Sequence, residues 1–123
     1  MEMPKIYESE YQFCLVLWAH EPITSPEIVK LCQEKLGWKR TTTYTVIKRL
    51  VERGVLRNEN GVITAVFSKE EAQTHEIDEL VEKRFEGSLP AFLAAFSRHK
   101  SLSAAELAEV QDMIDRIRQG EQP

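Results

Sequence analysis

Hydrophobic positions recur at helical spacing in the first part of the chain. Residues 6–20 contain an almost continuous apolar run, 13–19, which predicts a largely buried helix. Ser9 and Gln12 have the spacing of a capping box at its start. Glu21-Pro22 ends this helix, because the residue before a proline is disfavoured in helical conformation.

A second amphipathic helix is predicted from Thr24 to Gly37. Thr24 is placed to cap its first turn, and Glu27 is placed to bond back to Thr24. Pro26 is tolerated in the first turn of a helix. Its apolar stripe is Ile28, Leu31, Cys32 and Leu36. Gly37 ends the helix, and a short linker, 38–40, leads to a third.

The third helix lies within residues 38–54, WKRTTTYTVIKRLVERG. One face is expected to meet the core and carries Thr43, Val46, Ile47 and Leu50. The other carries Thr42, Thr45, Lys48 and Arg49. Gly54 ends the helix, since glycine accepts the left-handed conformation of a C-terminal cap. Two helices joined by a tight glycine turn, the second rich in hydroxyls and cations, predict a helix-turn-helix.

After Gly54 the pattern of apolar residues no longer has helical spacing and becomes typical of strands. The β-branched residues of 55–59 and 62–67 predict two strands, and Asn60-Gly61 between them is a strong type I′ hairpin signal. Three helices followed by a hairpin are the order of a winged helix, with the hairpin as the wing.

Residues 69–123 carry three further helical patterns. Their apolar stripes are Ile77, Leu80, Val81 and Phe85, then Leu89, Phe92, Leu93 and Phe96, then Leu107, Val110, Ile114 and Ile117. A break is expected near Gly87-Ser88. Ser103 and Glu106 form a capping box for the third helix, with Leu102 placed to pack on Leu107. We expect the tail, 120–123, to be disordered.

These patterns predict a mainly α fold with a small β-hairpin, organised as two domains. Residues 1–69 would form the winged helix-turn-helix, and 70–123 a three-helix dimerisation region. Short helices are marginal alone, so their stripes must be covered. A helical cap on the same domain is the alternative, but we favour a homodimer, because helix-turn-helix proteins usually bind two half-sites. The predicted dimer contacts are Leu80, Phe85, Leu89, Phe92, Leu93, Phe96, Leu107, Val110 and Ile114.

Charge is unevenly distributed. The net charge is −4, yet residues 39–57 hold six cations and one acid, and residues 69–123 carry a net of −5. A local basic stripe favours DNA as a partner. Cys14 and Cys32 lie among apolar residues and predict small buried side chains in a reducing, cytoplasmic compartment. No apolar run is long enough to span a bilayer.

No catalytic, cofactor or metal motif is present in the sequence. His20, His75 and His99 are scattered and lack ligand spacing, so we interpret them as surface residues. The competing function is a winged helix used only for protein–protein interaction. Such a module would expose apolar residues on its third helix, whereas this one exposes Thr, Lys and Arg.

Five short motifs in register resemble the penicillinase and methicillin-resistance repressors, a family with copper-responsive members. They are Ile6, Glu10 and Leu17-Trp18; Glu27-Ile28; the block Trp38, Thr42, Thr45, Arg49-Leu50 and Gly54; FEGSL at 85–89; and Leu102-Ser103 with Glu106-Leu107. The resemblance covers about residues 6–118.

The resemblance implies a homodimeric repressor that binds a dyad operator in double-stranded DNA. It assigns base reading to Thr42 and Thr45 and backbone contact to Arg49. Trp38 matches an aromatic residue near phosphate, although a wholly core position is nearly as well supported by the sequence. The predicted DNA-binding set is Trp38, Lys39, Arg40, Thr41, Thr42, Tyr44, Thr45, Lys48, Arg49 and Arg57.

The chain departs from the family pattern in three places. Relatives that respond to β-lactams are cut at an Asn-Phe bond by a membrane-linked receptor protease, which makes such a protease a candidate partner. The matching pair here is Ala95-Phe96. The C-terminal Cys-x-Cys pairs of copper-responsive relatives are missing. Tyr44 in the third helix and a wing tip without a cation, 59–62, indicate a different operator sequence.

Overall fold

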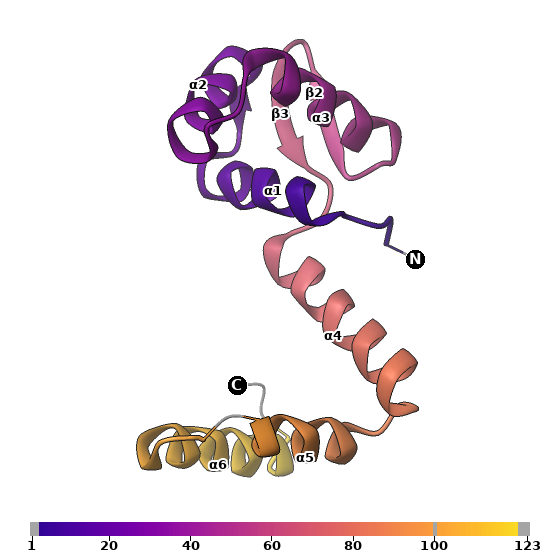
Figure 1. Cartoon of the computed structure of the whole chain (residues 1–123), viewed down its shortest axis with the longest axis vertical. Coiled ribbons are helices and arrows are strands. Elements are labelled where there is room, and N and C mark those ends of the chain that lie inside the picture. Colours follow the sequence, from indigo (N-terminus) through magenta and orange to yellow (C-terminus); the bar gives the residue numbers. More distant parts are fainter. Residues whose placement is uncertain (1–2, 100, 121–123) are drawn as a thin grey trace. The chain divides into compact units, whose positions relative to one another are not determined.

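The structure, a computed structural model, describes residues 3–99 and 101–120 (Figure 1). The chain divides into two compact units between Ile77 and Asp78. Its elements are α1 (Glu8–His20), β1 (Ile23–Thr24), α2 (Ser25–Leu36), α3 (Arg40–Glu52), β2 (Leu56–Glu59), β3 (Val62–Ala65), α4 (Lys69–Phe85), α5 (Leu89–His99) and α6 (Ala104–Arg118).

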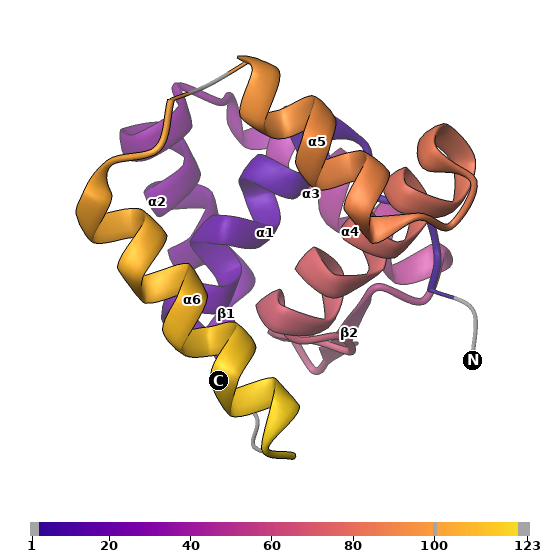
Figure 2. The same cartoon turned by 90° about the horizontal axis from the view of Figure 1, so that it is seen from below.

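The first unit is a winged helix built around one core. Helices α1, α2 and α3 pack on one another and against the small sheet (Figures 1 and 2). The core-facing stripe predicted for α3 is confirmed, since Thr43, Val46, Ile47 and Leu50 are all buried. These side chains meet Phe13 and Leu17 of α1, both of them fully buried. The predicted fold class is therefore confirmed.

Helix α1 begins before the predicted cap. The prediction that Ser9 and Gln12 form the capping box is wrong, because Ser9 lies inside the first turn. The Glu10 carboxylate instead accepts the N–H of Tyr7 at 2.9 Å. Arg53, the C-cap residue of α3, also donates to this carboxylate, so a contact distant in sequence holds the group that caps the start of α1.

The turn between α2 and α3 has the predicted form. The Thr24 hydroxyl caps α2, accepting the Glu27 N–H at 3.4 Å and donating to its carboxylate at 2.9 Å. Gly37 ends the helix with φ +68°, the left-handed conformation that glycine adopts without a steric cost. Helix α3 then begins three residues later, which completes the predicted helix-turn-helix.

The wing is an antiparallel hairpin of β2 and β3. Asn60 and Gly61 both have positive φ, as the predicted type I′ turn requires. The sheet is nevertheless larger than the predicted hairpin, with strand order β1-β3-β2. The third strand, Ile23–Thr24, pairs with Ile63 and Val62. Two residues are too short to show a strand period, so this strand was missed.

The second unit contains the end of α4 together with α5 and α6. Ser103 caps α6 by accepting the Glu106 N–H at 3.1 Å, while its own N–H bonds back to the Glu106 carboxylate, as predicted. Helices α5 and α6 do not pack side by side within the described part of the chain (Figure 2). No described side chain of residues 78–120 is buried. The predicted disordered tail, apart from Gly120, lies outside the described residues.

Candidate nucleic-acid interface

The face of α3 opposite the core is polar and accessible. The side chains of Thr41, Thr42, Thr45, Lys48 and Arg49 are all exposed. They occupy three successive turns of the helix, so hydroxyls and cations form one continuous surface. Hydroxyls and guanidinium groups bond to phosphate oxygens and to base edges in the major groove.

The threonines of α3 differ in how their hydroxyls are used. Thr45 donates to the Thr41 carbonyl at 2.9 Å, and buried Thr43 donates to the Lys39 carbonyl at 3.4 Å. A proton committed in this way leaves the Thr45 hydroxyl as an acceptor with its methyl group beside it. The Thr42 hydroxyl has no such bond among the described residues, so it is free to donate or accept.

The predicted cations occupy different surroundings. Lys39, Lys48 and Arg57 are exposed, the last on strand β2 of the wing. The Arg40 guanidinium lies over the ring of Tyr44, 5.5 Å from its centroid. Tyr44 is half-buried and packs against the core, which leaves only part of its ring accessible to a ligand.

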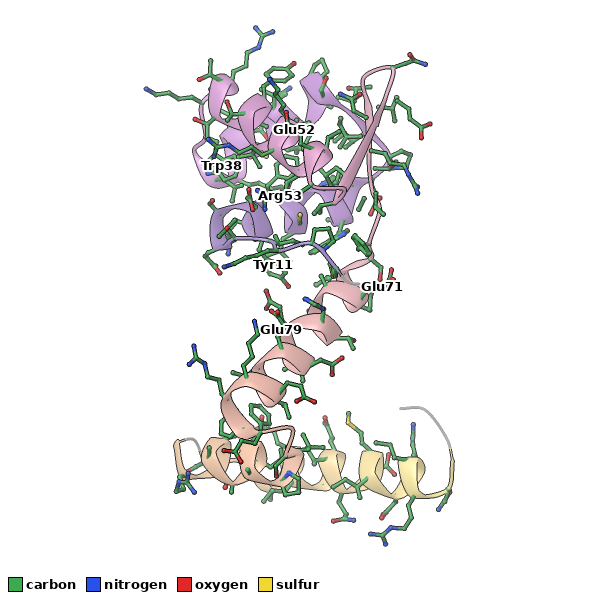
Figure 3. The ribbon with its side chains drawn as sticks, turned by 90° about the vertical axis from the view of Figure 1, so that its right-hand side faces the viewer. Tyr11, Trp38, Glu52, Arg53, Glu71 and Glu79 are labelled. Carbon is green, nitrogen blue, oxygen red and sulfur yellow. The ribbon has the colours of Figure 1, made fainter. Side chains whose placement is uncertain are left out.

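Arg53 is withdrawn from the basic stripe. Its guanidinium donates to both carboxylate oxygens of Glu10 and, at 2.8 Å, to the Lys5 carbonyl. Figure 3 labels Arg53 among the side chains of the first unit. Burial opposes ionisation of Glu10, but the hydrogen bonds from Arg53 and Tyr7 outweigh it and lower the pKa of this carboxyl. Five cations of the stripe remain without such a neutralising partner among the described residues.

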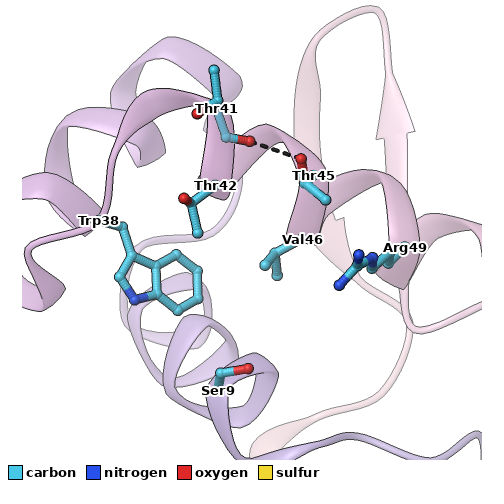
Figure 4. Close-up of a pocket in the computed structure, with 7 residues that line it drawn as sticks. All are labelled: Ser9, Trp38, Thr41, Thr42, Thr45, Val46 and Arg49. Atoms are coloured by element: carbon cyan, nitrogen blue, oxygen red, sulfur yellow. Dashed lines mark hydrogen bonds between the residues drawn. The ribbon is translucent and has the colours of Figure 1, made fainter.

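Trp38 is neither wholly buried in the core nor fully exposed. Its ring is half-buried and stacks on Phe13, with centroids 6.3 Å apart and planes 9° from parallel. The same residue lines an open hollow on the surface of α3 (Figure 4). The indole is therefore a core side chain with an accessible edge.

The hollow beside Trp38 joins five of the predicted DNA-binding residues. It is lined by Ser9, Trp38, Thr41, Thr42, Thr45, Val46 and Arg49. Lys39, Arg40, Tyr44, Lys48 and Arg57 do not line it. Ser9 was missed as a site residue because its sequence position suggested a cap. No local signal relates it to Arg49, since packing of α1 on α3 brings the two together.

The predicted dimer residues lie on open apolar faces. Leu80, Leu89, Leu93, Phe96, Leu107, Val110 and Ile114 are exposed. Phe85 and Phe92 are half-buried and meet edge to face, with ring centroids 5.6 Å apart. These stripes have no cover within the described part of the second unit.

The remaining candidate chemistry concerns the cysteines and histidines. Cys14 and Cys32 are buried and free, as predicted, and burial raises their thiol pKa values to about 12 and about 11. Such thiols stay protonated and unreactive at neutral pH. His20 is exposed and bonds through Nδ1 to the Val16 carbonyl, whereas His75 is half-buried; the His99 side chain lies outside the described residues.

The described residues offer neither a metal site nor a membrane-spanning helix. They contain no group of three or more His, Cys, Asp or Glu side chains that could hold a metal ion. Nor do they include a helix with the length and apolar character needed to cross a bilayer.

Comparison with known sequences identifies the family. A family model described as penicillinase repressor matches residues 6–116. The chain belongs to the penicillinase repressor family. The family match spans both structural units, so the winged helix and the C-terminal helices belong to one family architecture.

The individual relatives share low sequence identity with this chain. The chain is 23% identical over 118 residues to the penicillinase repressor of Bacillus licheniformis, covering 93% of this chain and 92% of that protein. It is 26% identical over 114 residues to an uncharacterized 16.5 kDa protein of Latilactobacillus sakei, covering 89% and 78%.

A solved structure of the Bacillus licheniformis repressor BlaI, a monomeric form in complex with the blaP half-operator, is also similar. It has a TM-score of 0.49 and 26% identity, and covers 57% of this chain and 90% of that one. The sequence resemblance to penicillinase repressors is thus confirmed by the family match.

Proposed function

We propose that this protein is a sequence-specific transcriptional repressor that binds a dyad DNA operator as a homodimer. The observation that carries the proposal is the exposed face of α3, where hydroxyls and cations lie side by side and the cations have no ion-pair partner among the described residues. Membership of the penicillinase repressor family supports the repressor role.

Two classes of contact follow from the chemistry of that face. Thr42 and Thr45 lie on the exposed turns of α3 and are short enough to approach base edges in the major groove. Lys39, Arg40, Lys48, Arg49 and Arg57 are long cations suited to phosphates, which hold the protein in register without reading sequence. Trp38 and Tyr44 present the edges of partly buried rings beside them.

The exposed surface of α3 favours DNA over a protein partner. A protein-interaction helix would present a buriable apolar patch, because such patches form the centres of interfaces. The exposed positions of α3 from Arg40 to Glu52 are instead Arg, Thr, Lys and Glu. Removing these cations from water without opposite charge would be costly, whereas DNA supplies that charge.

The second unit supports the homodimer. A stripe such as Leu89, Leu93 and Phe96 stabilises only when removed from water, at about 25 cal/mol per Å² of apolar area. Within the described residues these side chains are 40–54% exposed. A second copy related by a two-fold axis would cover them and present two α3 helices to two half-sites.

The proposal is tested by selecting duplexes from a random-sequence library with the full-length chain. The selected site should be an inverted repeat, and its affinity should fall steeply with salt as phosphate-bound counterions are released. Thr42→Ala and Thr45→Ala should relax sequence preference, each costing about 1–3 kcal/mol on the selected site. Arg49→Ala should weaken selected and random DNA alike.

Two outcomes contradict the proposal. Selection that yields no enriched site would leave the interaction-module alternative. Equal loss on selected and random DNA by all three variants would show that the contact roles of Thr42, Thr45 and Arg49 are wrongly assigned.

We further propose a route of induction that does not depend on cutting at Ala95-Phe96. This pair lies within helix α5, and it does not match the Asn-Phe pair of relatives cut by a receptor protease. A protease partner of that type would have to act at another bond. Incubation with such a protease followed by mass spectrometry of the fragments tests this; a cut between Ala95 and Phe96 would refute it.

A further inference from the structure

We propose that the hollow between the first turn of α1 and the outer face of α3 is the seat of one DNA backbone phosphate, bound jointly by Arg49 of α3 and Ser9 of α1. The inference rests on the proposed DNA-binding function and adds to it a second helix and a specific contact. We call this hollow the phosphate seat; it is lined by Ser9, Trp38, Thr41, Thr42, Thr45, Val46 and Arg49.

The two donors come from elements far apart in sequence. Ser9 lies on α1 and Arg49 on α3, and both border the same open space (Figure 4). Trp38 and Val46 form its apolar wall. A phosphate in this position would meet a cation on one side and a hydroxyl on the other, an arrangement that favours charge-assisted hydrogen bonds.

Charge distinguishes the seat from the neighbouring hollow. Arg49 also lines a second hollow, with Tyr7, Glu10, Glu52 and Arg53. That hollow contains two carboxylates, which repel an anion, and Glu10 already neutralises Arg53. Among the described residues that line the phosphate seat there is one cation and no acid. An anion attracted by Arg49 is therefore favoured on the Ser9 side.

Both donors are available for a ligand. Within the described part of the chain, neither the Ser9 hydroxyl nor the Arg49 guanidinium has a hydrogen-bond or ion-pair partner, and both side chains are exposed. Thr45 provides the contrast, because its hydroxyl donates to the Thr41 carbonyl at 2.9 Å. The Ser9 hydroxyl was expected to cap α1, and the actual start of the helix leaves it free.

The Glu10–Arg53 ion pair keeps the two donors in place. Glu10 follows Ser9 directly, and Arg53 lies one helical turn after Arg49. Glu10 is only 4% exposed, and Arg53 also donates to the Lys5 carbonyl. These contacts fix the first turn of α1 against α3, which makes Glu10 and Arg53 positioning residues for the seat.

The test uses the full-length chain and the duplex that it selects from a random library. One phosphate at a time is replaced by a neutral methylphosphonate. We expect one phosphate position in each half-site where the replacement weakens binding by the wild-type protein. At that position the replacement should have little further effect on binding by Ser9→Ala or Arg49→Ala. Ser9→Ala should weaken binding about tenfold on every sequence, as loss of a hydrogen bond to a charged group does. The double variant should lose less than the product of the two single losses.

Salt dependence separates the two donors. Arg49→Ala should reduce the slope of log affinity against log salt by about 0.9, the value for one phosphate, whereas Ser9→Ala should leave it unchanged. Ser9→Asp places a carboxylate in the seat and should weaken binding by at least about a hundredfold through repulsion of the phosphate and pairing with Arg49. Ser68→Asp is the matched control. It adds the same charge at the N-terminus of α4, where Ser68 accepts the Glu71 N–H, and should bind as the wild type does.

The outcomes distinguish this inference from the proposed function. Selection of a dyad site together with wild-type affinity for Ser9→Ala and Ser9→Asp would overturn the seat and leave the repressor proposal intact. Independent losses in the double variant, or methylphosphonate positions that differ between Ser9→Ala and Arg49→Ala, would also overturn it. Failure to select any site would remove the proposed function itself. Circular dichroism of each variant confirms that the helices are retained.

Discussion

Glu10 and Arg53 carry the main ion pair of the winged helix. Glu10→Gln should destabilise the protein by about 3 kcal/mol at pH 7, the lower end of the range for breaking a buried pair, because the Arg53 side chain is 29% exposed. Glu34→Gln, an exposed change on α2, is the control and should have little effect. Urea denaturation of the three proteins measures the difference in free energy of unfolding.

The same residue predicts a pH dependence. The pKa of Glu10 in the folded protein lies below its usual value of 4.5. Its stabilising contribution is therefore fully present above about pH 5 and is lost as pH falls through the lowered folded-state pKa. The stability difference between wild type and Glu10→Gln should narrow as the pH falls from about 5 into the acid range below 4.5. A difference that stays constant over that range would show that ionisation of Glu10 is not its source.

At the scale of elements, the wing depends on one backbone conformation. Gly61 has φ +85° and no atom within 4 Å of an added Cβ, so Gly61→Ala meets backbone strain but no clash. The substitution should destabilise the protein by about 1–2 kcal/mol, the cost of left-handed backbone for other residues. Asn60→Gly, the control, keeps the turn conformation and should change the thermal unfolding midpoint little. Equal thermal midpoints for Gly61→Ala and wild type would contradict the type I′ assignment.

At the scale of the whole molecule, the exposed stripes of the second unit determine assembly. Leu93 is 48% exposed on α5, so Leu93→Glu costs little within one chain but places a charge in the proposed dimer interface. We expect a folded monomer that binds half-sites weakly. Ala94→Glu, on the other side of α5, should remain a dimer. Ultracentrifugation with circular dichroism checks both; a dimeric Leu93→Glu, or its unfolding, would contradict the proposed division of the chain.

The local elements of this protein were predictable from its sequence, because each has signals within a few residues. Gly37 and Asn60-Gly61 need positive φ, and Thr24 and Ser103 supply caps, so the ends of α2, the wing turn and the start of α6 were predicted. The two faces of α3 followed from its period, since four buried positions recur every three or four residues.

Only the tertiary structure decided the features that join distant segments. The start of α1 depends on Arg53, 43 positions from Glu10, and a strand of two residues exists because β3 offers it a partner. The dual environment of Trp38 requires Phe13 beneath it. Ser9 joins the phosphate seat for the same reason: its nearest neighbours in sequence indicate a cap, whereas the packing of α1 on α3 exposes its hydroxyl beside Arg49.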